Sequence, residues 1–304
     1  MNLRDLEYLV ALADERHFGR AAAASYVSQP TLSTQVKKLE SELGVDLIER
    51  GSRQVLLTDA GEQVVRRARS ILAQAQDIRD LARSARDPRA GRLRLGMFPT
   101  LGPYLLPHVV PELRRRFPEL ELLLTEAKTS ELLSQLHAGA LDVALVALPV
   151  PDESLHAQPL FREDFLLAVP SEHPLAAAAE QVTPGSLAGE DLLLLAEGHC
   201  LRDQALEVCQ TTGAAEQAGF RATSLETLRH MVAAGVGSTL LPRLAVSPPA
   251  SSTDGIVLRE FAGQPPHRDI AAVWRRSSVQ GPLLAEIAAV LADLPTGLVT
   301  PVPR

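Results

Sequence analysis

The strongest constraint on the fold is the regular alternation of strand-like and helix-like segments beyond residue 92. Short apolar runs are separated by stretches in which apolar residues recur every three or four positions, the spacing of one helix face. Strands that alternate with helices predict a largely parallel α/β sheet, which binds ligands beyond the carboxyl ends of its strands. The pattern occurs in two sets, which predicts two lobes over residues 92–294. The expected strands are 93–98, 120–125, 143–147, 166–169, 192–195, 219–222, 239–242 and 270–274, and the expected helices are 105–117, 130–139, 201–208, 225–234 and 282–294.

Residues 1–58 have a different pattern, that of three short helices followed by a two-stranded wing over 48–56. The third helix is expected from Ser28, its N-cap, to about Leu43, with Pro30 in its first turn and Gly44 after its end. Its polar face suits the major groove in a helix-turn-helix, although a solvated face of any small helical domain has the same composition. The residues expected to contact DNA are Gln29, Pro30, Thr31, Ser33, Thr34, Lys37 and Lys38 on the helix, and Arg50 and Arg53 at the tip of the wing.

A long helix is expected over residues 59–86. Its apolar positions step alternately by four and three residues, which is the heptad seam of a helix pair: Val64, Ala68, Ile71, Ala75, Ile78, Ala82 and Ala85. A helix that packs only on its own domain has a similar stripe, but the alanines favour close pairing with a second copy. Residues 87–91 contain a proline and a glycine and are expected to be a hinge. The proline-rich residues 295–304 are expected to be a flexible tail.

Composition and charge limit the classes of function. No apolar run approaches the about 18–20 residues that span a bilayer, and the first residues enter an amphipathic pattern without a signal peptide. We therefore expect a cytoplasmic protein with no membrane partner. Residues 1–86 carry 13 Lys and Arg against 12 Asp and Glu, so the overall charge of −7 comes from the remainder. A nearly neutral N-terminal part still binds nucleic acid if its basic residues share one face.

Both cysteines, Cys200 and Cys209, lie in one predicted helix that begins after Gly198. Residues nine positions apart on a helix face opposite sides and are separated by about 13 Å along its axis. A disulfide requires Cα atoms within about 4.4–6.8 Å. The two cysteines can therefore join only if the helix unwinds. The helix N-terminus favours a thiolate at Cys200, and His199 and Arg202 stand close enough in sequence to add positive charge. Two inert, buried cysteines are the simpler alternative.

Several segments resemble the LysR-type transcriptional regulators. They are residues 18–22, 27–33, 39–44 and 57–61 in the first part, and 173–175 and 233–237 in the second. The resemblance implies an N-terminal all-α winged helix-turn-helix over 1–58, a dimerisation helix over 59–86, and a two-lobed α/β effector domain similar to periplasmic binding proteins. It further implies double-stranded promoter DNA and RNA polymerase as partners, and a homo-oligomer that is a dimer of dimers.

Four further segments, 1–13, 99–108, 198–205 and 220–229, resemble the members of this family that sense hydrogen peroxide, and general members lack the cysteine segment. Thiolate attack on peroxide needs a donor for the departing hydroxide and yields a sulfenic acid, which condenses with a second thiol. The resemblance implies Cys200 as the peroxide-reactive cysteine, Cys209 as the resolving one, and Thr100, Thr129, His199 and Arg268 around the peroxide. For the two threonines, capping of a helix that follows a strand is the alternative.

The sequence thus predicts an activator of oxidative-stress genes that responds to hydrogen peroxide through a reversible disulfide and is reduced by a separate thiol system. It is not expected to be an enzyme. No cofactor is expected, and no metal, because His199 and the two cysteines would supply at most three ligands on opposite helix faces. Two alternatives remain. One is a LysR-type regulator of a bound metabolite with incidental cysteines, and the other is a thiol peroxidase.

Overall fold

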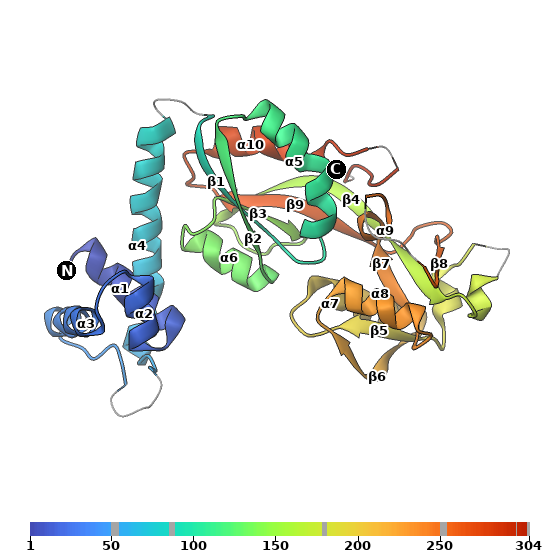
Figure 1. Cartoon of the computed structure of the whole chain (residues 1–304), viewed down its shortest axis with the longest axis horizontal. Coiled ribbons are helices and arrows are strands. Elements are labelled where there is room, and N and C mark those ends of the chain that lie inside the picture. The colour runs from blue at the N-terminus through green and yellow to red at the C-terminus, as the bar shows by residue number, and fades with distance from the viewer. Residues whose placement is uncertain (50–54, 85–88, 178–180, 250–253, 296, 303–304) are drawn as a thin grey trace. The chain divides into compact units, whose positions relative to one another are not determined.

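The structure is a computed structural model of the chain, drawn in Figure 1. It describes residues 1–49, 55–84, 89–177, 181–249, 254–295 and 297–302. The chain divides into two compact units, each described here by itself. One unit is Met1–Ala85 with His137–Ala140, and the other is Arg86–Leu136 with Leu141–Arg304. In the part of the chain that is described, no helix is both long enough and apolar enough to cross a membrane.

The N-terminal unit contains the three expected short helices and the expected long one. They are α1 (Leu3–Glu15), α2 (Phe18–Ala24), α3 (Gln29–Leu43) and α4 (Asp59–Ser84). The Ser28 hydroxyl caps α3 by accepting a hydrogen bond from the backbone N–H of Thr31, and Gly44 ends the helix in the left-handed conformation. The buried stripe of α3 consists of Leu32, Val36 and Leu39, whereas Leu43 is 38% exposed.

The wing is only partly described. An isolated antiparallel bridge joins Ile48 to Leu57, but the expected tip with Arg50 and Arg53 lies outside the described residues. The chain then turns tightly into α4. A Cβ atom on Gly61 would lie 2.1 Å from the backbone carbonyl oxygen of Leu47, so this turn requires glycine.

Helix α4 buries Val65, Ala68 and Ala73. Two residues of the predicted heptad seam, Ile71 and Ile78, are instead 40% and 68% exposed. Large apolar side chains that stay in water along one helix are unfavourable in an isolated chain, so this part of the seam suits a second helix.

The second unit is a mixed α/β sheet, not the largely parallel one that the alternation predicts. Its strand order is β2-β1-β3-β9-β4-β7, with β8 beside β4 and a separate pair β5-β6. The pairs β1-β2, β1-β3 and β5-β6 are parallel, and the pairs of β4 and β9 are antiparallel. The strands are β1 (Gly91–Met97), β2 (Leu120–Glu126), β3 (Val143–Ala147), β4 (Leu155–Pro170), β5 (Asp191–Leu195), β6 (Ala215–Ala222), β7 (Thr239–Pro242), β8 (Ile256–Arg259) and β9 (His267–Arg275).

Two separate cores confirm the expected two lobes of this unit (Figure 1). One core surrounds β1 and β3, and the other surrounds β5 and β7. Strand β4 passes from one to the other, because its first part pairs with β9 and its last part pairs with β7. The helices are α5 (Gly102–Arg116), α6 (Thr129–His137), α7 (Cys200–Thr212), α8 (Leu225–Ala233), α9 (Arg243–Val246) and α10 (Gly281–Ala292), with 3-10 turns η1 (Pro174–Ala176) and η2 (Pro184–Leu187).

Several boundaries correct the sequence prediction. The expected strand 166–169 is only the end of β4, and β8 was not predicted. Helix α7 begins at Cys200 and extends beyond Cys209, so both cysteines are helical. The tail is not free throughout: Thr300 forms a two-way backbone bridge with Arg162, and Leu298 packs on the first core. These contacts explain why the expectation of a flexible tail is wrong at that point.

Candidate functional site

The site is centred on Cys200, the first residue of α7. Just before it, Gly198 adopts φ +86°, a conformation that favours glycine. The neighbouring segment before α6 lies against this turn, since Lys128 Nζ donates a hydrogen bond of 2.7 Å to the carbonyl of Glu197. A Cβ on Gly198 would meet that ammonium group at 2.9 Å. The lysine thus joins the two lobes at the start of the cysteine helix.

Thr100 and Arg268, which the resemblance implies around the peroxide, are in contact with each other. Thr100 follows β1 and is 3% exposed, and Arg268 is on β9 and 2% exposed. Arg268 Nη1 donates to Thr100 Oγ1 at 3.0 Å, and Nη2 donates to the Thr100 carbonyl at 2.9 Å. The Thr100 hydroxyl in turn donates to the Cys200 sulfur and favours the thiolate. Thr100 therefore does not cap a helix: the N-cap of α5 is Leu101 and makes no side-chain cap bond.

Burial raises the pKa of the Cys200 thiol above its ordinary value. The Arg268 charge, the backbone N–H of Leu201 and the Thr100 hydroxyl all oppose this shift, while Asp203 adds to it. Desolvation is the largest of these effects, so the net change in the Cys200 pKa is upward, which favours the protonated thiol. The backbone N–H of Leu201 acts in the direction that the sequence predicts for a helix N-terminus, but burial opposes it and is the larger effect.

His199 and Arg202 do not supply the positive charge that their positions suggest. Burial, helped by the Lys128 charge, lowers the pKa of His199, so its imidazole is neutral at neutral pH. Arg202 is 7% exposed and binds both carboxylate oxygens of Glu216 at 2.8 and 2.7 Å. It also donates to the carbonyl of Leu195. Arg202 thus anchors α7 to β5 and β6, and His199 remains as a neutral hydrogen-bonding group.

Thr129 Oγ1 and Gln204 Oε1 are among the buried polar atoms that have no hydrogen-bond partner within the described residues. Thr129 is the first residue of α6 and follows Lys128, whose side chain lies against Gly198. Gln204 is one helical turn after Cys200. Buried polar groups usually have a hydrogen-bond partner, so both atoms are available to contact a small polar molecule. Gln204 was not predicted from the sequence. Its only sequence signal is the four-residue spacing from the cysteine.

The fold does not place Cys209 next to Cys200. Both cysteines are free, and Cys209 is 6% exposed in the second core. They lie nine residues apart in α7, which places them on opposite sides of the helix about 13 Å apart along its axis. Leu201 and Ala205, both 2% exposed, hold the intervening turns in that core. The expected geometric conflict between the helix and the disulfide is thus present.

A cavity of about 430 Å³ adjoins the site. Thr100, Tyr104, Glu126 and Glu226 are among its lining residues. The Tyr104 hydroxyl donates to Glu226 at 3.2 Å, and burial together with this carboxylate raises the pKa of Tyr104 to about 12. The cavity is larger than peroxide needs. Its described lining suits a small polar molecule.

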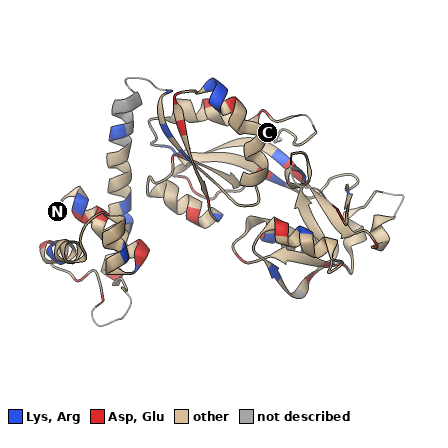
Figure 2. Cartoon of the chain, viewed as in Figure 1, with Lys and Arg blue, Asp and Glu red and all other residues tan. Residues whose placement is uncertain are grey.

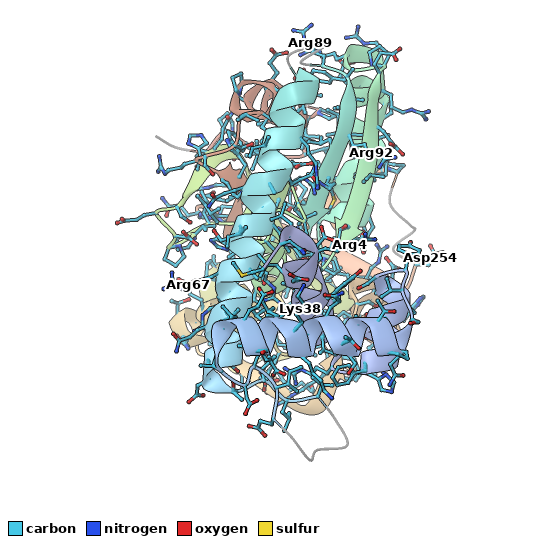
Figure 3. The ribbon with its side chains drawn as sticks, turned by 90° about the vertical axis from the view of Figure 1, so that its left-hand side faces the viewer. Arg4, Lys38, Arg67, Arg89, Arg92 and Asp254 are labelled. Atoms are coloured by element: carbon cyan, nitrogen blue, oxygen red, sulfur yellow. The ribbon has the colours of Figure 1, made fainter. Side chains whose placement is uncertain are left out.

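The predicted DNA-contacting residues are accessible on α3. Gln29, Pro30, Thr31, Thr34, Lys37 and Lys38 are exposed, and Ser33 is half-buried. Figure 3 marks Lys38 on this helix. Tyr26, in the turn before α3, has φ 55° and is 96% exposed, which adds a candidate contact that the sequence interpretation missed. Figure 2 shows basic residues interspersed with acidic ones over this unit. Binding of DNA by this unit must therefore depend on basic residues that share one face, not on its net charge.

No group of three or more His, Cys, Asp and Glu side chains is arranged to hold a metal ion within the described ranges.

Comparisons with known proteins match both units. Residues 3–62 match the bacterial regulatory helix-turn-helix of the LysR family, and residues 86–295 match the LysR substrate binding domain. The DNA-binding transcriptional dual regulator OxyR of Escherichia coli strain K12 is 52% identical over 278 residues, which are 91% of this chain and 90% of that protein.

Solved structures give the same result. A cysteine-to-aspartate variant of full-length OxyR from Pseudomonas aeruginosa superimposes with a TM-score of 0.79 at 40% identity, covering 100% of this chain and 99% of that one. A cysteine-to-serine variant of OxyR from Corynebacterium glutamicum, described as bound to hydrogen peroxide, has a TM-score of 0.66 at 36% identity, with 96% and 91% of the chains covered.

Proposed function

Because this chain belongs to the LysR family of bacterial transcriptional regulators, and within it to the OxyR proteins, we propose that Cys200 and Cys209 form the switch of a hydrogen peroxide-responsive, DNA-binding regulator. The observation that carries the proposal is the surroundings of Cys200: a half-buried thiol at a helix start, beside the Thr100 hydroxyl and the Arg268 guanidinium. The unpartnered Thr129 hydroxyl supplies the polar contact that a bound peroxide needs.

The first chemical step is attack of the Cys200 sulfur on one peroxide oxygen. The O–O bond breaks, the sulfur becomes a sulfenic acid, and the second oxygen leaves as hydroxide, which a proton converts to water. The hydroxyls of Thr100 and Thr129 and the neutral His199 are the groups that donate to the departing oxygen. Arg268 favours the thiolate from which the attack starts.

The second step requires α7 to unwind. The Cys209 thiol attacks the sulfenic acid, a sulfur–sulfur bond forms, and a second water leaves. Since the helix keeps the two sulfurs on opposite sides, the segment 201–208 must leave its helical conformation first. Residues released from the second core then repack and move the effector lobes. A separate thiol system reduces the bond and resets the protein.

The DNA-binding part reads promoter DNA through α3, with Gln29, Ser33 and Thr34 toward base edges and Lys37 toward phosphates. The exposed seam residues Ile71 and Ile78 support dimerisation through α4, and we propose a dimer of dimers. The protein acts with RNA polymerase as an activator in the cytoplasm. It is a regulator rather than an enzyme, since each oxidation converts its own two thiols to a disulfide, which a separate reductant must restore.

Two other functions fit part of the structure. The cavity beside Thr100 suits a small metabolite, which would make the cysteines incidental. The Cys200 site also suits a thiol peroxidase, which would turn over with a thiol reductant.

The test is mass spectrometry of the full chain after one equivalent of hydrogen peroxide. We expect a Cys200–Cys209 bridge in the natural sequence, no oxidation of Cys209 in Cys200→Ser, and sulfenic acid at Cys200 in Cys209→Ser. Absence of the bridge would support the metabolite regulator. Continuous peroxide consumption in the presence of a thiol reductant would support the peroxidase.

A further inference from the structure

A buried ion pair lies directly behind the Cys200 site. Glu163 on β4 and Arg268 on β9 are partners in the antiparallel register, and both side chains are fully buried. Arg268 Nε and Nη2 donate to Glu163 Oε2 at 2.8 and 2.7 Å. The next pair along the same two strands, Arg162 with Asp269, has the opposite order of charges. Consecutive pairs point to opposite faces of a sheet, so only the first pair faces Thr100.

The Glu163 carboxylate is held in one position by hydrogen bonds to both of its oxygens. Its other oxygen, Oε1, accepts a hydrogen bond of 2.8 Å from the backbone N–H of Leu244 in α9. Both carboxylate oxygens are therefore engaged, one by the arginine and one by the backbone that follows β7. A buried carboxylate with both oxygens bound fixes its partner in place.

The guanidinium is in turn fixed on all sides. Its Nε–Nη2 edge faces Glu163, its Nη1 and Nη2 atoms face Thr100, and its carbon lies 5.1 Å from the centre of the Phe98 ring. Because Nη1 occupies a lone pair of the Thr100 hydroxyl, the hydroxyl hydrogen is directed elsewhere, toward Cys200.

We propose that Glu163 is a positioning residue for the reaction of Cys200 with peroxide: it holds Arg268 against Thr100 and balances the guanidinium charge beside the sulfur. The proposal rests on the function proposed above for Cys200.

The other charged groups near Cys200 do not determine how much positive charge acts on its sulfur. Asp203 lies on α7 itself and disfavours the thiolate. On the side of α6, Lys128 acts on His199, which is neutral because it is buried. From β9, Arg268 is the cation that favours the thiolate. Glu163, bound to that cation, is therefore the residue that sets how much of its positive field reaches the sulfur.

The experiment is the pH profile of Cys200 alkylation by iodoacetamide in the reduced, full-length protein, resolved by peptide mass spectrometry. Glu163→Gln keeps the shape but leaves the arginine charge unbalanced. It should lower the apparent pKa of Cys200 by roughly one unit, which accelerates alkylation about tenfold at neutral pH. Glu163→Asp keeps the charge and should restore the natural profile. Cys209, measured in the same digest, serves as an internal reference and should not change.

The matched control is Asp269→Asn, which breaks the neighbouring ion pair of the same two strands on the other face. It should leave the Cys200 profile unchanged. An unchanged or raised Cys200 pKa in Glu163→Gln, or an equal shift in Asp269→Asn, would overturn the proposal. If Glu163→Gln does not fold, Arg268→Met carries the test with the opposite sign: it should slow alkylation of Cys200, and an unchanged rate would overturn the proposal.

The assay contains no peroxide, so its outcome is separate from that of the proposed function. A protein that shows the predicted alkylation shift but forms no sulfenic acid with peroxide would refute the sensor function alone.

Discussion

The ion pair between Arg202 and Glu216 should set how easily the disulfide forms. Arg202 belongs to the segment that must unwind, and Glu216 on β6 holds it with two hydrogen bonds. Glu216→Gln removes the negative charge that faces the 7% exposed arginine and replaces one of its two acceptor oxygens by an amide NH2 group, while the Leu195 carbonyl remains as an acceptor. Breaking a fully buried pair costs about 3–5 kcal/mol and an exposed one under about 1 kcal/mol. Since Glu216 is 27% exposed, we expect an intermediate cost of about 2 kcal/mol to the helical state.

If oxidation unwinds α7, Glu216→Gln destabilises only the reduced protein, in which the helix is intact. The midpoint potential of the Cys200–Cys209 couple should then become more negative by about 40 mV, which corresponds to an about 30-fold more favourable disulfide. The assay is equilibration in glutathione buffers of defined ratio, followed by alkylation and mass measurement of each redox form.

Asp142→Asn provides the control for this potential. It breaks a partly buried ion pair with Arg94 in the first lobe, far in sequence from α7. It should destabilise the reduced and oxidised forms alike, with no change in potential. A midpoint that stays constant or becomes more positive in Glu216→Gln would show that Arg202 keeps its partner after oxidation, and would refute the reasoning.

Three further predictions concern other parts of the chain. Lys37→Ala should weaken binding to all DNA sequences and reduce the slope of log affinity against log salt by about one, whereas Ser33→Ala should relax sequence preference, as measured by fluorescence anisotropy. Because burial raises the pKa of Cys200, its alkylation rate should increase about tenfold per pH unit through the neutral range, and a plateau below the ordinary thiol pKa of about 8.5 would contradict the raised value. Gly61→Ala should destabilise the protein by about 2 kcal/mol in urea unfolding, because the new methyl group overlaps the Leu47 carbonyl, and an unchanged midpoint would contradict that close approach.

Local signals predicted the helices well. The cap at Ser28, the stop at Gly44 and the apolar stripe of Leu32 and Val36 all act within one or two turns, so the sequence alone contains them. Of the predicted heptad seam, Ala68 is buried within its own unit and Ile71 and Ile78 are exposed, so pairing with a second copy stays a prediction.

The sheet was predicted less well, because strand pairing depends on residues far apart in the sequence. Alternation of strands and helices does not reveal that β4 and β9 run antiparallel, or that β4 passes from one lobe to the other. The length of β4 was missed because charged residues interrupt its apolar pattern. Those charges, Arg162 and Glu163, pair with Asp269 and Arg268 on β9, which no local signal reveals.

At the site, the resemblance to peroxide-sensing regulators identified the residues. The structure shows which of their effects on the pKa of Cys200 is the largest. Thr100 and Arg268 are in contact with each other as expected. The raised pKa of Cys200 and the neutral state of His199 were not predictable, because both follow from burial, which is a property of the folded chain.

The central claim is that peroxide joins two cysteines which the α7 helix keeps apart. The most direct test is amide hydrogen exchange on the reduced protein and on protein treated with one equivalent of peroxide. Backbone amides over residues 201–208 should lose protection on oxidation, while those of α8 keep it. Unchanged protection over 201–208, in protein whose Cys200–Cys209 bond is confirmed by mass, would contradict the unwinding of α7.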